Sequence, residues 1–309
     1  MTEIIAVFPG QGAQQVGMLA DLASQYPEIH ATFAEASTAL NFDLWDRVQN
    51  GSAETLNLTY NTQPALLTAS VALWRVVKAQ KPALKVLAGA GHSLGEYSAL
   101  VAANALSFTE AVRLVRTRGE LMDAALPAGQ GGMAAILGLT EAQIRVVCAE
   151  ASSVAPVDPA NFNAPGQIVI AGAMAGIEKA IELAKAAGAK RALPLSVSGP
   201  FHSKLMKAAA EKFAEALAKV AFRAPEFPVY HNVTNQPATL AQISPMLLEQ
   251  LYSPVNWIGA VQACRPAGAL AVEFGPGKVL AGLNKRIDDS LETLTTGDVT
   301  ALTATLARL

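Results

Sequence analysis

The sequence is poor in charge. Only 16% of its 309 residues are charged, whereas globular domains typically carry about 25%. The 23 Lys and Arg residues nearly balance the 25 Asp and Glu residues, giving a formal net charge of -2. Because such a chain has no basic excess to neutralise phosphates, we expect no nucleic-acid partner. The hydrophobic share of 51% also argues against a disordered chain.

Cysteine and long apolar runs are scarce as well. The two cysteines, Cys148 and Cys264, form neither a disulfide framework nor a metal motif, so we expect a cytoplasmic protein without a metal site. Mean hydropathy is +0.30, yet no stretch offers the ~20 uninterrupted apolar residues that a membrane helix needs. The start of the chain lacks the basic region of a secretory signal. We therefore expect no membrane association.

The two outer parts of the chain alternate apolar runs bounded by glycine with helical patterns. This alternation is typical of an α/β protein with a mainly parallel sheet. We expect strands over 4–8, 86–90, 229–232 and 271–274. We expect helices over 27–40, 65–77 with Pro64 at the start, 94–103, 109–125, 204–220, near 245–265 and after Gly277. A chain of this length can bury about 75% of its unfolded surface, enough for a large core.

The middle of the chain has a different order of elements. We expect, in sequence, a strand over 133–139, a helix over 141–151, strands over 156–162 and 167–171, a helix over 175–187 and a strand over 190–195. Thr140 and Gln143 fit a capping box, and Gly188 fits a helix stop. The order β-α-β-β-α-β is that of a ferredoxin-like unit. We therefore predict a ferredoxin-like domain at 125–197, inserted in a discontinuous α/β-hydrolase-like catalytic domain at 1–124 and 198–309.

A serine stands between a predicted strand and a predicted helix. Gly91-His92-Ser93-Leu94-Gly95 matches G-x-S-x-G, in which two glycines let the chain turn sharply and project the serine hydroxyl above the sheet. The N-terminus of the following helix and the Leu94 N–H would then stabilise negative charge beside Ser93. The alternative is a structural turn whose serine caps the helix. The surrounding strand and helix favour a nucleophile.

Four histidines are available as the base that a serine nucleophile needs. His30 lies in a helical pattern and His231 ends a strand, so we expect structural roles for both. His92 adjoins Ser93, where neighbouring side chains point in different directions. His202 lies in a loop and follows Ser93 in the chain, as the base does in α/β-hydrolases. We predict that His202 is the general base.

A glycine loop, Pro9-Gly-Gln-Gly12, follows the first predicted strand. It fits a dinucleotide fingerprint badly, because Gln15 stands where the third glycine is required. A glycine loop can instead bring a backbone N–H close to a nucleophile. We expect Gln11, through its backbone N–H or its amide, to help stabilise an oxyanion next to Ser93.

One arginine falls on the apolar face of a predicted helix. At about 100° per residue, Arg118 lies in the arc of Leu114, Val115 and Leu121, away from Arg116. A buried guanidinium needs an anionic partner, because leaving it unpaired costs several kcal/mol. That partner is either an internal Asp or Glu or a substrate carboxylate held by a bidentate fork. The second option would make the substrate a dicarboxylic monoester or thioester.

Seven short motifs, spread along the chain, together point to one protein family. They are Phe-Pro-Gly-Gln-Gly-Ala-Gln at 8–14, Asn-Thr-Gln-Pro-Ala-Leu at 61–66, Gly-His-Ser-Leu-Gly-Glu-Tyr-Ser-Ala-Leu at 91–100, Arg118 in Thr-Arg-Gly, Asn-Phe-Asn-Ala-Pro-Gly-Gln at 161–167, Phe-His at 201–202 and Gln-Leu-Tyr-Ser-Pro-Val at 250–255. Together they resemble the malonyl-CoA:acyl carrier protein transacylases, the FabD-like acyltransferases of fatty-acid and polyketide synthesis. The likeness runs essentially from end to end.

The resemblance assigns a role to each candidate residue. It implies that Ser93 is acylated, that His202 is its base, and that Arg118 pairs with the malonyl carboxylate. It also implies an oxyanion hole formed by Gln11 and the Leu94 N–H. Malonyl transfer from malonyl-CoA to the phosphopantetheine thiol of acyl carrier protein would then proceed through a malonyl-serine intermediate.

The resemblance further implies the surroundings of this site. A main-chain carbonyl at Gln250 would orient the histidine in place of a triad acid, and Gln63 and Asn163 would line the pocket. No metal or redox cofactor would be needed. The expected partner is acyl carrier protein, and we expect the enzyme to be a monomer. Since such carriers are acidic, basic residues are candidates for docking: Lys190, Arg191, Lys285 and Arg286.

Two other functions fit part of the pattern. An esterase or thioesterase would use the same serine elbow without requiring Arg118. A non-catalytic scaffold or carrier-binding subunit would require neither Ser93 nor His202 as reacting groups. Loss of malonyl transfer in Arg118→Ala would separate acyl transfer from the hydrolase, and a malonyl adduct that is absent in Ser93→Ala would separate it from the scaffold.

Overall fold

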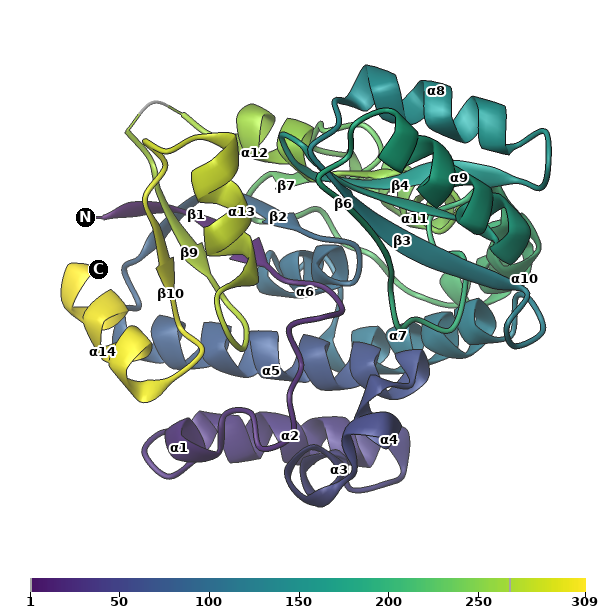
Figure 1. Ribbon diagram of the computed structural model, residues 1–309. Coiled ribbons are helices and arrows are strands. Elements are labelled where there is room, and N and C mark those ends of the chain that lie inside the picture. The colour runs from purple at the N-terminus through teal and green to yellow at the C-terminus, as the bar shows by residue number, and fades with distance from the viewer. Residues whose placement is uncertain (1, 267) are drawn as a thin grey trace.

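The computed structural model describes residues 2–266 and 268–309 and contains two sheets (Figure 1). The first sheet is parallel throughout, with strand order β10-β9-β1-β2-β7. Its strands are β1 (Glu3–Phe8), β2 (Lys85–Gly91), β7 (Val229–Tyr230), β9 (Leu270–Glu273) and β10 (Thr293–Thr295). The helices associated with it are α1 (Ala20–Ala23), α2 (Pro27–Leu40), α3 (Leu44–Asn50), α4 (Ala53–Asn57), α5 (Thr59–Gln80), α6 (Gly95–Ala102), α7 (Phe108–Asp123), α10 (Lys207–Leu217), α11 (Leu240–Gln250), α12 (Trp257–Cys264), α13 (Val279–Ile287) and α14 (Val299–Arg308).

The parallel sheet is buried on both faces. Along β1, Ile4 and Phe8 belong to a core shared with α5 and α6, whereas Ile5 and Val7 pack with α12 and α13 on the other face. This follows from the strand period of two, which sends successive side chains to opposite faces. Burying each large apolar side chain contributes about 1.5–3 kcal/mol. A strand covered on both faces therefore reads as a continuous apolar run, which is why its position was predictable.

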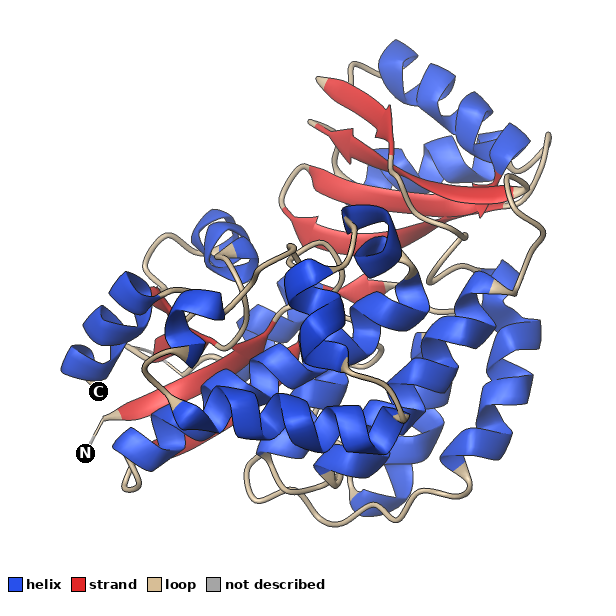
Figure 2. Ribbon diagram, turned by 90° about the horizontal axis from the view of Figure 1, so that it is seen from below, coloured by secondary structure: helices blue, strands red, loops and turns tan. Residues whose placement is uncertain are grey.

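The second sheet has the order β6-β3-β5-β4-β8, and its first four strands pair in antiparallel fashion. They are β3 (Gly131–Leu137), β4 (Val157–Ala164), β5 (Gln167–Ala173) and β6 (Arg191–Pro194). Helices α8 (Glu141–Ala151) and α9 (Met174–Ala186) cover the face turned away from the parallel sheet (Figures 1 and 2). The other face packs against the main core through Met133, Val169 and Ala171.

The expected fold class, including the β-α-β-β-α-β order, is confirmed. The capping box of Thr140 and Gln143 is present, and Gly188 has a φ of 91° just past α9. The edge strand β8 (Val255–Asn256) was not expected. It comes from the C-terminal part of the chain and pairs with β4, so the second sheet contains a strand from outside the predicted insertion. The division at 124/125 and 197/198 stays a prediction.

The expected start of a helix at Pro64 is wrong. Pro64 lies inside α5, which begins at Thr59. Proline lacks the N–H that would bond the carbonyl four residues earlier, and in a helix interior this normally breaks the helix. Here the Arg116 Nη1 of α7 donates to that carbonyl, the Tyr60 O, at 3.1 Å. A side chain from another helix thus replaces the missing donor.

The remaining elements differ mainly at their ends. The predicted helix over 204–220 is a short 3₁₀ turn at Lys204–Met206 followed by α10. The short helices α1, α3 and α4 and the C-terminal β10 and α14 were not expected. Among the described residues, no helix is both long and apolar enough to cross a membrane.

Candidate active site

The turn between β2 and α6 holds Ser93 in a strained conformation. Its φ is 51°, in the left-handed region that residues other than glycine rarely adopt. A Cβ at Gly91 would lie 1.9 Å from the Gly95 carbonyl carbon, and a Cβ at Gly95 would lie 2.0 Å from the Phe8 O. Both positions therefore require glycine. This is the geometry of a nucleophile elbow, in which the serine is raised above the strand ends.

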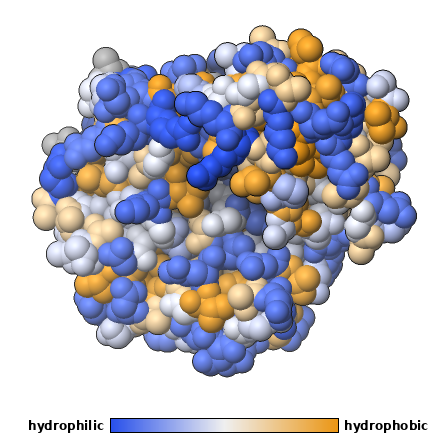
Figure 3. All heavy atoms as spheres, in the orientation of Figure 1, coloured by the Kyte–Doolittle hydropathy of each residue, from blue (hydrophilic) through white to orange (hydrophobic). Residues whose placement is uncertain are grey.

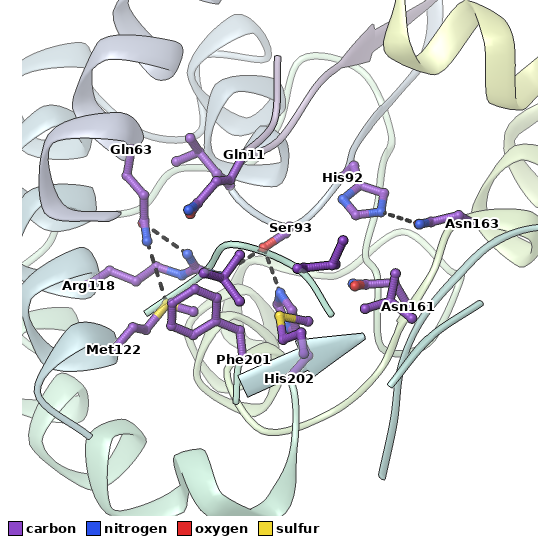
Figure 4. Close-up of a pocket in the computed structure, with 15 residues that line it drawn as sticks. Gln11, Gln63, His92, Ser93, Arg118, Met122, Asn161, Asn163, Phe201 and His202 are labelled. Atoms are coloured by element: carbon purple, nitrogen blue, oxygen red, sulfur yellow. Dashed lines mark hydrogen bonds between the residues drawn. The ribbon is translucent and has the colours of Figure 1, made fainter. Parts of the chain in front are cut away.

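His202 lies within hydrogen-bond reach of that serine. Its Nε2 is 2.8 Å from the Ser93 Oγ (Figure 4). Its Nδ1 is 2.8 Å from the Gln250 main-chain O. With Nδ1–H donating to the carbonyl, Nε2 is the lone-pair nitrogen that faces the hydroxyl. Burial, and after it the nearby Arg118 charge, lowers the pKa of His202 to about 3. The imidazole is therefore neutral at ordinary pH and able to accept a proton.

Arg118 projects from α7 into the same region and is only 1% exposed. Its Nη2 donates to the Ser93 Oγ at 3.2 Å and to the Gln250 Oε1 at 2.8 Å, and its Nη1 donates to the Gln63 Oε1 at 2.9 Å. Its Nε is buried with no hydrogen-bond partner among the described residues. No described carboxylate lies within 4.0 Å of this guanidinium. Of the two partners expected for Arg118, an internal carboxylate in direct contact is thus absent from the described chain.

Leu94 and Gln11 are the two groups expected to form an oxyanion hole. The Leu94 N–H lies at the N-terminus of α6, and within the described chain no acceptor faces it. Gln11, from the loop after β1, borders the same cavity as Ser93 (Figure 4). Buried N–H donors near a helix N-terminus stabilise developing negative charge, because their dipoles are already oriented.

These groups line a cavity of about 180 Å³. The space-filling view of the face in Figure 1 is hollowed near its centre, with hydrophilic residues above the hollow (Figure 3). Polar groups of the cavity come from the loops after β1, β2 and β6, from strand β4 and from helices α5 and α7. Its apolar wall is not evident from the sequence. That wall consists of Met122, Met133, Val169, Leu195, Val197 and Phe201. A small, largely apolar cavity with a few oriented polar groups is typical of a ligand site.

Asn163 and Gln63 both border the cavity, as expected. The Asn163 Oδ1 is 2.8 Å from the Nε2 of His92, and burial lowers the pKa of that imidazole (Figure 4). His92 thus belongs to the cavity wall through its bond to Asn163. Asn161 also lines the cavity. Its only sequence signal was its place in the same Asn-Phe-Asn segment.

Residues 5–282 match the acyl transferase domain family. The chain belongs to the acyl transferase family. Malonyl CoA-acyl carrier protein transacylases resemble it over their whole length. That of Salmonella typhimurium is 53% identical over 310 aligned residues, covering 100% of both chains. That of Bacillus subtilis is 48% identical, covering 96% of this chain and 94% of the other.

Solved structures of relatives have the same fold as this acyltransferase. An acyl carrier protein S-malonyltransferase from Vibrio cholerae aligns with a TM-score of 0.94 and 51% identity, covering 99% of this chain and 100% of the other. A malonyl-transacylase solved in complex with a type II polyketide acyl-carrier protein aligns with a TM-score of 0.96 and 48% identity over 100% of both chains. The resemblance read from the motifs is confirmed, and the protein is an acyltransferase.

The structure brings together every residue that the sequence singled out for this site. Ser93, His202, Arg118, Gln11, Leu94, Gln63 and Asn163 border one cavity, and Gln250 lies directly behind it. What the sequence missed is the side chain of Gln250, which contacts Arg118, and the groups that hold it.

Proposed function

We propose that the protein transfers a malonyl group from malonyl-CoA to the phosphopantetheine thiol of acyl carrier protein, through a malonyl ester of Ser93. The observation that carries this proposal is the guanidinium of Arg118 within 3.2 Å of the Ser93 Oγ. A fixed cation beside the nucleophile selects an acyl group that carries its own carboxylate. The buried Arg118 Nε, which has no partner among the described residues, is a free donor for that carboxylate.

Acylation begins with proton transfer. His202 Nε2 takes the proton of the Ser93 hydroxyl as the oxygen attacks the thioester carbonyl. The Gln250 carbonyl holds Nδ1–H and stabilises the imidazolium that forms. The tetrahedral oxyanion receives hydrogen bonds from the Leu94 N–H and from Gln11. When the C–S bond breaks, His202 returns the proton to the coenzyme A thiolate.

The second half of the reaction reverses these roles. His202 takes the proton of the phosphopantetheine thiol, and the sulfur attacks the malonyl ester of Ser93. Collapse of the tetrahedral adduct releases the serine oxygen, which regains its proton from His202, and leaves malonyl-carrier protein. Serine, imidazole, amide and guanidinium groups supply all the proton transfers and charge stabilisation in these steps. We therefore propose that the enzyme works without a metal or redox cofactor.

The carrier partner is supported by the relative solved with its acyl-carrier protein. The four basic residues considered for docking, Lys190, Arg191, Lys285 and Arg286, are all exposed. Arg286, however, already donates to the Gln167 Oε1 and to the Pro165 O at 3.2 Å, and so bonds α13 to the turn between β4 and β5. We propose the first three as the carrier contacts. Monomeric state, cytoplasmic location and the absence of nucleic-acid or membrane partners stay predictions of the sequence.

Intact-mass measurement after mixing with malonyl-CoA tests the central proposal. We expect a single malonyl adduct on the wild-type protein and none on Ser93→Ala. The matched control is Ser98→Ala, a serine in the same helix region that does not line the cavity, which should be acylated normally. Transfer of the malonyl group from Ser93 to a carrier protein, rather than its hydrolysis by water, separates acyl transfer from an esterase or thioesterase. A wild-type protein that forms no adduct would contradict the proposal.

A further inference from the structure

A fully buried carboxylate, Glu96, lies behind the serine elbow and has no part in the steps above. It is on α6 and is 0% exposed. Its Oε2 accepts hydrogen bonds from the Asn232 backbone N at 2.9 Å and from the Gln250 Nε2 at 2.8 Å. Its Oε1 lies 2.5 Å from the His231 Nδ1. Burying a carboxylate this completely is costly unless another charge compensates it.

The side-chain amide of Gln250 connects this carboxylate to the arginine of the active site. Its Oε1 accepts from the Arg118 Nη2 at 2.8 Å, while its Nε2 donates to Glu96 and, at 3.0 Å, to the Ser93 O. The negative end of the amide dipole thus faces the cation, and its positive end faces the anion. Hydrogen bonds in such a chain polarise one another and strengthen in a buried setting. The main-chain O of the same Gln250 faces His202.

The charges of the two buried groups are complementary. Arg118 has no carboxylate in direct contact within the described chain. The nearest internal anion along its hydrogen bonds is Glu96, from which the Gln250 amide separates it. Burial lowers the pKa of the Arg118 guanidinium, while the neighbouring Tyr97 and Glu96 oppose that change. Without an anion nearby, keeping the guanidinium charged and buried would cost several kcal/mol.

Glu96 is also connected by hydrogen bonds to the turn that holds Ser93. The backbone N–H of Asn232 donates to Glu96. The Asn232 Oδ1 accepts from the Ser93 N–H at 2.7 Å, and its Nδ2 donates to the Gly91 O at 2.7 Å. The strained turn is therefore bonded to the same network as the arginine. One carboxylate holds two supports of the site, Asn232 for the serine and Gln250 for Arg118 and His202.

We propose that Glu96 is the buried counter-charge of Arg118, and that it acts through the Gln250 amide as a positioning residue for the site. In the empty enzyme it compensates the arginine, and when a substrate carboxylate binds, that carboxylate takes over part of the compensation. This second part rests on the proposed function, whereas the coupling of the two buried charges in the free protein does not.

The test separates charge from hydrogen bonding. In Glu96→Gln, the amide oxygen can accept from Asn232 and Gln250, and the amide NH₂ can donate to His231 in its other tautomer. The variant thus removes the charge and keeps the shape and the bonds. Combined with Arg118→Gln it forms a double-mutant cycle, measured as the thermal midpoint of the full-length free protein.

We expect Glu96→Gln alone to lower the midpoint by roughly 5–10 °C. In the Arg118→Gln background the same substitution should lower it by less than half as much, because no charge is then left uncompensated. Additive shifts would overturn the proposal. If Glu96→Gln fails to fold, a soluble, folded double variant supports the coupling, and a double variant that also fails overturns it. The matched control is Glu292→Gln, which breaks an exposed pair with Arg308 and should shift the midpoint by about 1–2 °C or less.

A second readout asks whether a substrate-like anion can replace the missing charge. Malonate should raise the midpoint of Glu96→Gln by more than that of wild type, with acetate at equal ionic strength as the control. Equal or smaller shifts in the variant would count against charge compensation. Because the cycle is measured without substrate, a failure of malonyl transfer would refute the proposed function and leave the coupling measured by the cycle unaffected.

Discussion

Replacing Arg118 with glutamine should destroy selectivity for malonyl groups while leaving acetyl transfer much less affected. The guanidinium is buried, bonded to Gln63 and Gln250, and it retains a free Nε donor. A substrate carboxylate that enters this cavity after the change would be buried without a cation. Breaking a buried ion pair by removing one partner costs about 3–5 kcal/mol. That cost corresponds to a fall of about two to three and a half orders of magnitude in kcat/KM for malonyl-CoA.

Acetyl-CoA carries no carboxylate, so its rate reports only the other effects of the substitution. The Arg118 Nη2 also donates to the Ser93 Oγ, so some loss common to both substrates is expected. The diagnostic quantity is therefore the ratio of kcat/KM for malonyl-CoA to that for acetyl-CoA, measured by the rate of adduct formation on Ser93. Arg113→Gln, an exposed arginine on the same helix, should leave the ratio unchanged. An equal fall for both substrates in Arg118→Gln would refute the carboxylate role.

Three further predictions concern the base, the elbow and the helix that carries Gln63. The pKa of His202 is lowered to about 3, so its neutral form persists as pH falls. We therefore expect kcat/KM for serine acylation to stay constant through pH ~6.5, and a fall centred at that pH would contradict this prediction. Gly95→Ala places a methyl group 2.0 Å from the Phe8 O, so it should lower the thermal midpoint or abolish soluble expression, and an unchanged midpoint would refute the steric account. Arg116→Met leaves the Tyr60 carbonyl without its donor and should lower the free energy of unfolding by about 1–3 kcal/mol in denaturant titrations.

The parts of the fold that could be predicted from the sequence are those set by local pattern. Strand β1 is a continuous apolar run, α2 begins at a proline, and α8 begins at a capping box. The start of α5 was missed because its continuation through Pro64 depends on Arg116, far along the chain. Strand β8 was missed because a two-residue strand has no periodicity of its own.

The candidate site likewise contains residues that a local pattern predicts and residues that it does not. Ser93 and Arg118 were found because each breaks a local pattern, one as a serine between two glycines and one as a charge on an apolar helix face. Gln250 was placed through its main-chain carbonyl, but its side chain joins Arg118 to Glu96, a residue 154 positions away. Nothing in the order of residues predicts that a glutamine at the end of α11 will meet a glutamate on α6. Only the packing of these helices brings the two together.

The position of Arg118 makes substrate recognition and base strength interdependent. After burial, the charge of Arg118 is the largest cause that lowers the pKa of His202, so an imidazolium formed during acylation lies in the field of a cation. A carboxylate paired with Arg118 offsets that field. If the substrate carboxylate pairs with Arg118 as proposed, the acyl group that binds best also eases protonation of the base, whereas an uncharged acyl group leaves the repulsion in place. Selectivity should then appear in kcat as well as in KM, because the interaction stabilises the transition state, with its imidazolium, more than the ground state with a neutral imidazole.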